Sequence, residues 1–325
     1  MKRLITLILI AIGSFSQLFA AVSDNPDTLI VARDGTGQYR TINEAIDVCR
    51  AFMEYHKVIF VKKGVYKEKV EIPSWLTNIE IVGEDVDKTI ITYDDHANIR
   101  IPGTDKAMGT FRTFTVKVEG SDITFKNITI ENNAAKLGQA VALHTEGDRL
   151  VFIGCKFLGN QDTVYTGVAG TRILFKNCYI EGTTDFIFGP STAWFENCTI
   201  FSKADSYVTA ASTPQEVKYG YVFDHCKLTA AEEVTKVYLG RPWRPYAYTL
   251  FIKCEMGRHI RPEGWFNWSN PANEKTARYL EYNNSGEGAN TGKRVAWSKS
   301  LTKKEAQTIT KENVFLLNNN WLPQE

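Results

Sequence analysis

Hydrophobic and polar positions alternate in six short segments between residues 122 and 256. The segments read ITFKNITI, LVFIGCKF, ILFKNCYI, AWFENCTI, YVFDHCKL and TLFIKCEM. Each is centred on a phenylalanine, and these are Phe125, Phe152, Phe175, Phe195, Phe223 and Phe251. The phenylalanines are 27, 23, 20, 28 and 28 residues apart, which is a typical period for a solenoid. Because one such strand cannot bury its apolar face alone, the pattern predicts a parallel β-helix in which like residues of neighbouring coils stack.

The two ends of the chain carry signals for short covering helices. Residues 41–44 (TINE) form a capping box. Apolar residues then recur at helical spacing, at Ile42, Ala45, Ile46, Cys49 and Met53. Residues 302–305 (TKKE) repeat the capping box near the C-terminus, and VIFVKKGVYKEKVEI and NIEIVGE alternate like further strands before the repeats. We therefore expect an all-β solenoid with capping helices at its N- and C-terminal ends.

Two adjacent repeats carry an aspartate at the same place. Asp162 in QDTVY and Asp185 in DFIFG each follow the repeat phenylalanine by ten residues. Equal offsets in adjacent coils predict stacked positions, about 4.8 Å apart on one exterior face. Asp205 has the same offset from Phe195, but a longer segment follows it, so we interpret it as a turn residue.

The first twenty residues have the pattern of a secretory signal peptide. They combine a basic start, an apolar run over residues 4–12 and small residues near Ala20. The apolar run is too short for a membrane anchor. We expect cleavage near Ala20 and one β-helix catalytic domain over residues 21–325. Removing Lys2 and Arg3 leaves 36 of the 38 basic residues against 37 acidic ones, a net charge of −1 that favours neither nucleic acid nor an anionic membrane.

Five of the six cysteines sit three residues after a repeat phenylalanine. They are Cys155, Cys178, Cys198, Cys226 and Cys254, whereas Cys49 stands apart. Export would permit disulfides. A residue repeated at one inward position is more simply a small buried hydrophobe in a ladder, and this is our interpretation. No CxxC pair or histidine cluster accompanies them, so we expect no metal site.

A stacked carboxylate pair suits two kinds of chemistry. Two carboxylates this close cannot both ionise freely, so one serves as an acid while the other stays anionic. That asymmetry fits either glycoside hydrolysis or acyl transfer through a carboxylate nucleophile. Gln161 precedes Asp162, and Gln139 lies one coil earlier, so two neutral amide donors are available for an oxyanion. Arg241 could bind a carboxylate through two bonds and keep it ionised.

Four short motifs carry a resemblance to a known family. GQAVAL (138–143), QDTVY (161–165), DFIFG (185–189) and LGRPW (239–243) occur in the order found in pectin methylesterases. The similarity continues in VARDGTGQYRTINEAI, GVYKEKV, PEGWFNW and EYNNSGEGAN, and covers residues 30–325. The resemblance implies a right-handed parallel β-helix. It also implies hydrolysis of galacturonate methyl esters in pectin, with release of methanol and pectate.

The resemblance implies catalytic roles, residue by residue. Asp185 matches the nucleophile that attacks the ester carbonyl. Asp162 matches the general acid that protonates methanol and then the base that activates water. Gln139 and Gln161 match the residues that stabilise the tetrahedral oxyanion. Arg241 matches the residue that orients the nucleophile and keeps it charged.

Other matched positions concern the substrate. Trp243 matches an aromatic wall beside the nucleophile, and Tyr165 and Phe188 fall where family members line the sugar-binding groove. An aromatic residue beside a core strand is often simply part of the core, and this is the alternative for Phe188. The chain departs from the family at Thr184, where valine is common, and at His144, where arginine is common. The first puts the packing behind Asp185 in question, and the second a contact at the rim.

The resemblance also sets expectations about partners. We expect a monomeric enzyme, secreted or periplasmic, that binds methylated homogalacturonan and needs no metal or other cofactor. A pectin or pectate lyase shares the architecture, but would need a Ca²⁺ site of clustered carboxylates or a basic proton abstractor. A polygalacturonan glycoside hydrolase would have no use for two amide donors. A non-catalytic adhesin would need no aspartate pair.

Overall fold

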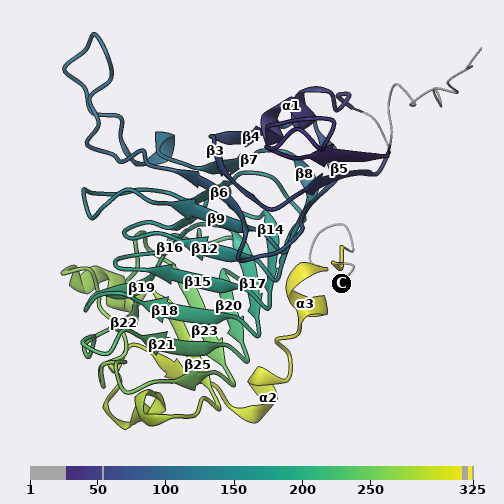
Figure 1. The fold of residues 1–325 in the computed structure, drawn as a ribbon. Helices are drawn as coiled ribbons and strands as arrows, with labels where there is room; N and C mark the ends of the chain where they lie inside the picture. Colours follow the sequence, from purple (N-terminus) through teal and green to yellow (C-terminus); the bar gives the residue numbers. More distant parts are fainter. Residues whose placement is uncertain (1–26, 53–54, 317–320, 324–325) are drawn as a thin grey trace, which may run out of the picture.

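The chain winds into stacked coils whose strands form three parallel sheets (Figure 1). The structure, a computed structural model, describes residues 27–52, 55–316 and 321–323. Within this part, one sheet has 11 strands, one has eight and one has seven, and strands of successive coils are neighbours in each. This arrangement is a parallel β-helix, as the repeats predicted. The expected signal peptide lies outside the described residues.

Within each sheet, every strand comes from a different coil. The 11-stranded sheet contains β1 (Thr28–Val31), β2 (Lys57–Val61), β5 (Thr77–Gly83), β8 (Ser121–Lys126), β11 (Leu150–Ile153), β14 (Arg172–Lys176), β17 (Thr192–Glu196), β20 (Tyr221–Asp224), β23 (Tyr248–Ile252), β25 (Arg278–Tyr282) and β26 (Lys299–Ser300). The eight-stranded sheet contains β3 (Gly64–Lys67), β6 (Thr89–Tyr93), β9 (Thr129–Asn132), β12 (Lys156–Leu158), β15 (Tyr179–Gly182), β18 (Thr199–Ser202), β21 (Lys227–Ala230) and β24 (Glu255–Met256). The seven-stranded sheet contains β4 (Val70–Ile72), β7 (Val116–Val118), β10 (Leu143–Thr145), β13 (Val164–Thr166), β16 (Ile187–Gly189), β19 (Tyr207–Ala211) and β22 (Tyr238–Gly240).

A left-handed residue makes the corner between the 11-stranded and eight-stranded sheets. It always stands two positions after the repeat phenylalanine, with φ of 51 to 61°. These residues are Asn127, Gly154, Asn177, Asn197, His225 and Lys253. Asparagine and glycine tolerate this conformation better than other residues, which explains their frequency here. The corner therefore repeats at the same place in every one of these coils.

The six repeat phenylalanines form one column in the core. They pair in register from β8 to β23, and each is fully buried. Neighbouring ring centroids are 4.3 to 5.3 Å apart, with stacked planes. The predicted ladder is confirmed. Its register fixes where all following residues of each coil lie.

A second column of cysteines runs beside the phenylalanines. Cys155, Cys178, Cys198, Cys226 and Cys254 are buried free thiols, as is Cys49. Each of the five repeat thiols lies 3.3 to 3.5 Å from the carbonyl oxygen of the phenylalanine in the preceding coil. The interpretation as a ladder of buried thiols is confirmed.

The N-terminal helix covers the first coil as predicted. Helix α1 (Ile42–Asp47) begins at a capping box formed by Thr41 and Glu44. Its buried side chains belong to the same hydrophobic core as strands β1, β2 and β4, which the helix contacts. The helix ends at Asp47, before the predicted Cys49 and Met53, and Met53 lies outside the described residues. Cys49 is still buried against the core.

The C-terminal helices lie elsewhere than expected. Helix α2 (Lys303–Ala306) begins at the predicted capping box, and α3 (Lys311–Phe315) follows it. Both run alongside the 11-stranded sheet (Figure 1), where Val314 and Phe315 pack on its outward apolar residues Leu174 and Trp194. They do not cover the last coil; partly buried residues of the segment 289–297 pack on the core there. The other helices of the described residues are short 3-10 helices, namely η1 (Thr110–Arg112), η2 (Pro271–Lys275), η3 (Glu287–Ala289) and η4 (Thr291–Lys293).

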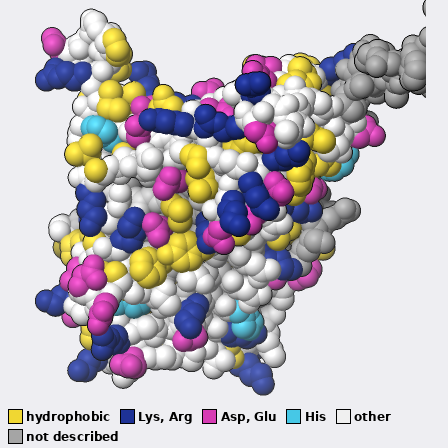
Figure 2. Space-filling view, viewed as in Figure 1, with side chains coloured by type: hydrophobic (Ala, Val, Ile, Leu, Met, Phe, Trp, Pro, Cys, Tyr) yellow, Lys and Arg dark blue, Asp and Glu magenta, His cyan; other side chains and the backbone are white. Residues whose placement is uncertain are grey.

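The surface shows no segregation of charge on the face in Figure 2. Basic and acidic side chains are interspersed there, in agreement with a net charge close to zero. Among the described residues, no helix has the length and apolar character needed to cross a bilayer.

Candidate functional site

The two aspartates occupy equivalent turns of adjacent coils. Asp162 stands two residues before β13 and Asp185 two residues before β16, and these strands pair with Val164 opposite Ile187. The amide of Asp162 donates to the carbonyl of Thr184, 3.1 Å away. Both aspartates have left-handed φ angles, 66° and 49°, which are uncommon for side-chain-bearing residues and are often found at functional sites. The predicted stacking is confirmed by this register.

The pair is more enclosed than an exterior position suggests. Only 8% of Asp162 and 5% of Asp185 is exposed. They line a pocket of about 340 Å³ together with Gln139, Gln161 and Arg241. Side chains from later coils and from the 110–111 turn add further walls, which the repeat alone could not indicate.

Arg241 holds one aspartate and not the other. Its Nε is 3.0 Å from Oδ1 of Asp185, and its Nη2 is 2.6 Å from Oδ2, so the guanidinium grips the carboxylate with two donors. The guanidinium carbon lies 4.0 Å from the centre of the Tyr207 ring and 3.7 Å from that of Trp268. The cation is thus held between two aromatic faces, an arrangement that favours arginine over lysine.

This asymmetry separates the proton affinities of the two carboxyl groups. Burial raises the pKa of Asp162 well above its usual range, and the negative charge of Asp185 raises it further. Burial also raises the pKa of Asp185, but the hydrogen bonds and charge of Arg241 oppose that rise. Of the two, Asp162 is therefore the carboxyl group that binds a proton more readily, and Asp185 is the one that ionises more readily.

Two side-chain amides border the pair. Gln139 and Gln161 are both half-buried and both line the pocket. Within the described part of the chain, neither side-chain amide makes a hydrogen bond, so the two do not bond to each other in an amide ladder. Their N–H groups are free to donate to a ligand in the pocket.

The predicted aromatic residues form a continuous surface beside the pair. Phe188 and Trp243 line the pocket, with ring centroids 5.9 Å apart. Tyr165 stacks on Phe188 at 4.7 Å; it lies in the coil of Asp162 and outside the residues that line the pocket. Phe188 is 4% exposed and belongs to a small outer cluster with Phe114, apart from the main core.

Sequence reasoning missed several residues of the site. Trp268, Tyr207 and Phe111 had no assigned role, although Trp268 and Phe111 line the pocket and Tyr207 packs on Arg241. Trp268 stands in PEGWFNW, which was noted only as part of the resemblance. Its position, directly beside the Arg241 guanidinium, depends on a loop without repeat register. The signal that could have found it was an aromatic residue in a motif with no structural role assigned.

The two residues that depart from the family pattern, Thr184 and His144, both contact neighbouring side chains. The hydroxyl of Thr184 lies 2.8 Å from that of Ser206 behind Asp185. His144 is buried in the row of Tyr165, with ring centroids 4.8 Å apart, and its Nε2 is 2.9 Å from Glu146. Burial lowers the pKa of His144 to about 4. Asp205 accepts hydrogen bonds from the amides of residues 235 and 236, which confirms it as a turn residue.

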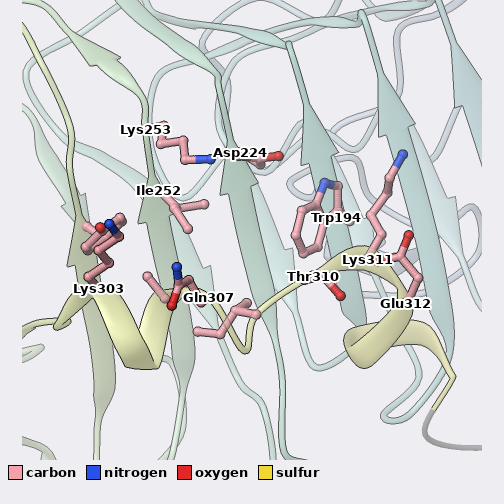
Figure 3. Close-up of a pocket in the computed structure, with 12 residues that line it drawn as sticks. Trp194, Asp224, Ile252, Lys253, Lys303, Gln307, Thr310, Lys311 and Glu312 are labelled. Carbon is pink, nitrogen blue, oxygen red and sulfur yellow. The ribbon is translucent and has the colours of Figure 1, made fainter.

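A second pocket lies on a different sheet (Figure 3). It has a volume of about 430 Å³ and separates the outer face of the 11-stranded sheet from α2 and α3. Trp194, Ile252 and Lys253 come from the sheet, and Gln307 and Thr310 from the helical segment. This pocket contains no stacked carboxylate pair, so the candidate active site is the pocket around Asp162 and Asp185.

A comparison with protein families assigns the chain. The model of the family described as pectinesterase matches residues 28–319. The chain belongs to the pectinesterase family. Its sequence is 39% identical to pectinesterase 31 of Arabidopsis thaliana over 285 residues, which are 85% of this chain and 88% of the relative.

Some pectinesterase relatives are much longer than this chain. A probable pectinesterase/pectinesterase inhibitor of Brassica napus is 38% identical over 312 residues, which are 91% of this chain and 52% of the relative. A pectinesterase/pectinesterase inhibitor of Brassica campestris is also 38% identical over 312 residues, which are 91% of this chain and 53% of the relative. The chain therefore spans about half the length of these two proteins.

Solved pectin methylesterases share the architecture. The carrot enzyme is 33% identical, superposes with a TM-score of 0.83, and the match covers 91% of this chain and 95% of the other. A pectin methylesterase crystallised in complex with a hexasaccharide is 27% identical, with a TM-score of 0.77 and coverage of 91% and 98%. The chain thus has the right-handed parallel β-helix fold of pectinesterases. In the described residues, no group of three or more His, Cys, Asp or Glu side chains could hold a metal ion.

Proposed function

We propose that this protein hydrolyses methyl esters of galacturonate residues in pectin through an acyl-enzyme on Asp185. The observation that carries the proposal is the unequal treatment of two stacked carboxylates. Arg241 binds Asp185 with two donors, whereas Asp162 is buried without such a partner. One group is thereby prepared as a nucleophile and the other as an acid.

In the first step, an ionised Asp185 oxygen attacks the ester carbonyl carbon. The carbonyl π electrons move to oxygen, and the amide N–H groups of Gln139 and Gln161 donate to the resulting oxyanion. When this intermediate collapses, the bond to the methoxy oxygen breaks and Asp162 supplies the proton that leaves with methanol. The products are methanol, an anionic Asp162 and a mixed anhydride between Asp185 and galacturonate.

In the second step, water hydrolyses the anhydride. Asp162, now ionised, takes one proton from water while the water oxygen attacks the galacturonyl carbon. The same two amides stabilise the second oxyanion. Collapse breaks the bond to Asp185, which leaves as a carboxylate that Arg241 again binds. The sugar leaves as a free galacturonate, and its carboxyl proton lowers the pH of the medium.

The aromatic surface supports a polysaccharide as substrate. Tyr165, Phe188 and Trp243 present rings beside the catalytic pair, and aromatic faces are suited to the apolar faces of sugar rings. The structural relative with a bound hexasaccharide supports the same substrate class for this chain. We infer that methylated homogalacturonan lies along this row of rings.

The competing reactions on pectin differ in their products. A lyase would need a base that takes a carbon-bound proton, and the basic group beside the pair, Arg241, is already bound to Asp185. A glycoside hydrolase would leave the two amides without a role. Incubation of the purified protein with methylated pectin should release methanol and lower the pH. Ultraviolet-absorbing unsaturated ends would instead identify a lyase, and new reducing ends a hydrolase; either product without methanol would overturn the proposal.

A further inference from the structure

Two motifs without a role in the proposed chemistry meet at one buried ion pair. PEGWFNW supplies Trp265, and EYNNSGEGAN supplies Glu281. The Nε of Arg294 is 2.8 Å from Oε1 of Glu281, and its Nη2 is 3.1 Å from Oε2. The indole N–H of Trp265 donates to the same Oε1 at 3.3 Å. Only 5% of the Arg294 side chain and 3% of the Glu281 side chain is exposed.

The same guanidinium also holds the backbone of the loop that begins PEGWFNW. Its Nη1 donates to the carbonyls of Arg261 and Pro262, each at 3.1 Å, and its Nη2 donates to the carbonyl of Gly288 at 2.7 Å. Gly264 has φ of +71°, and a Cβ there would lie 2.5 Å from Cδ of Arg294. The loop therefore fits closely around this one side chain.

The loop is joined in turn to β22, the strand that ends directly before Arg241. The amide of Leu239 donates to the carbonyl of Gly264 at 2.7 Å, and the amide of Phe266 donates to that of Gly240 at 3.1 Å. Two residues beyond Phe266, the Trp268 ring covers the Arg241 guanidinium at 3.7 Å. An unbroken series of contacts thus leads from Arg294 to the group that binds the nucleophile.

We propose that Arg294, with Glu281 and Trp265, is a positioning residue that sets the orientation of the Arg241 fork toward Asp185. A contribution to the stability of the fold does not by itself explain this ion pair, because replacing a buried ion pair by apolar residues is often neutral or stabilising. A bidentate arginine–carboxylate contact, in contrast, depends on the angle of the planar fork. The network fixes that angle through the Trp268 face.

This inference rests on the proposed function for its kinetic test. Two variants weaken the network to different degrees. Trp265→Phe removes the indole N–H and keeps a smaller aromatic ring, whereas Arg294→Lys keeps the charge and loses the planar fork. Both should lower kcat for methanol release by about 10- to 100-fold, as small misplacements in an active site do, and leave KM nearly unchanged. Ile59→Ala, a buried core position in β2 whose coil supplies no residue of the pocket, is the control for general destabilisation.

The pH profile separates positioning from a purely structural role. The charged groups beside Asp185 in the pocket are Asp162 and Arg241, and the charge of Asp185 also contributes to the raised pKa of Tyr279 in the core, after burial. Because a poorly aligned Arg241 stabilises the carboxylate less, the acid limb of kcat/KM should move to higher pH in Trp265→Phe and Arg294→Lys. In Ile59→Ala, the melting temperature should fall while kcat and the acid limb stay as in the wild type.

Hydrogen exchange gives a readout that needs no activity. Amides of residues 239–241 and 264–268 should exchange faster in Arg294→Lys than in the wild type, whereas Ile59→Ala should leave them unchanged. If the wild type releases no methanol, the proposed function fails, but the exchange comparison still tests the network. If both network variants keep wild-type kcat and acid limb in a folded enzyme, or if exchange at these amides is unaffected, the positioning role is wrong.

Discussion

Replacing Arg241 by lysine tests the asymmetry on which the proposed mechanism depends. Lysine keeps the positive charge but can place only one donor where arginine places two on Asp185. A hydrogen bond to a charged group contributes about 1.5–3 kcal/mol. Losing one such bond should therefore lower kcat/KM by about 10- to 150-fold, since each 1.36 kcal/mol corresponds to about tenfold in rate.

The same change should alter the pH dependence in a defined direction. Arg241 lowers the pKa of Asp185, so a weaker contact lets that pKa rise. Asp185 must be ionised to attack, so activity at low pH is lost earlier. Methanol release measured from pH 4 to 8 should show the acid limb of kcat/KM moved upward by about one to two pH units, the equivalent of about 1.5–3 kcal/mol.

Arg244→Lys provides the control for this experiment. Arg244 is three residues away, bonds the carbonyl of Trp243 at 3.1 Å and lies over its ring, but has no acidic partner among the described residues. Its substitution should leave the acid limb in place. An unmoved acid limb in Arg241→Lys, or an equal displacement in both variants, would show that the guanidinium fork does not control the ionisation of Asp185.

Further substitutions test the remaining groups. Asp185→Asn should abolish methanol release, and wild-type release from this variant, with deamidation excluded, would disprove the nucleophile. Asp162→Asn should be badly impaired in methanol release, yet its melting temperature at pH 7 should be higher than that of the wild type. The pKa of Asp162 is raised in the folded state, so its ionised carboxylate destabilises the fold at any pH above the pKa that the group has in the unfolded chain. The gain in melting temperature should therefore vanish as the pH falls toward 4. Gln139→Ala and Gln161→Ala should each fold normally and lower kcat by about 10²–10³; unchanged kcat would remove the amide from the oxyanion site. Cys178→Ala should cost roughly 1–3 kcal/mol in unfolding free energy, and alkylation of native protein at this thiol would contradict its burial.

Much of the site could be predicted because a solenoid encodes its register in the sequence. Once Phe152 and Phe175 are neighbours, residues ten positions further on must stack, and Asp162 and Asp185 do so. The repeat register did not predict that Trp268 and Tyr207 belong to the site. The contact of Trp268 with Arg241 depends on a loop that leaves the repeat and returns to it. The spacing of residues in the sequence does not indicate which side chains such a loop contacts.

The C-terminal helices show a second limit of the sequence pattern. The capping box at residues 302–305 indicated where α2 begins, but not what it packs against. The outward residues Leu174, Trp194 and Leu250 indicate where the C-terminal helices pack, because apolar side chains on the exterior of a strand must be covered by another element. Strands β14, β17 and β23 are buried on both faces for this reason.

The constant distance from the repeat phenylalanine to the aspartate turn has an evolutionary consequence. The coils vary from 20 to 28 residues, yet the ten residues from Phe152 to Asp162 and from Phe175 to Asp185 are the same in length. Insertions and deletions elsewhere in a coil can therefore reshape the walls of the pocket without moving the two aspartates apart. A lineage could gain or lose whole coils beyond them in steps of about 4.8 Å, changing the length of bound polymer while inheriting the chemistry intact.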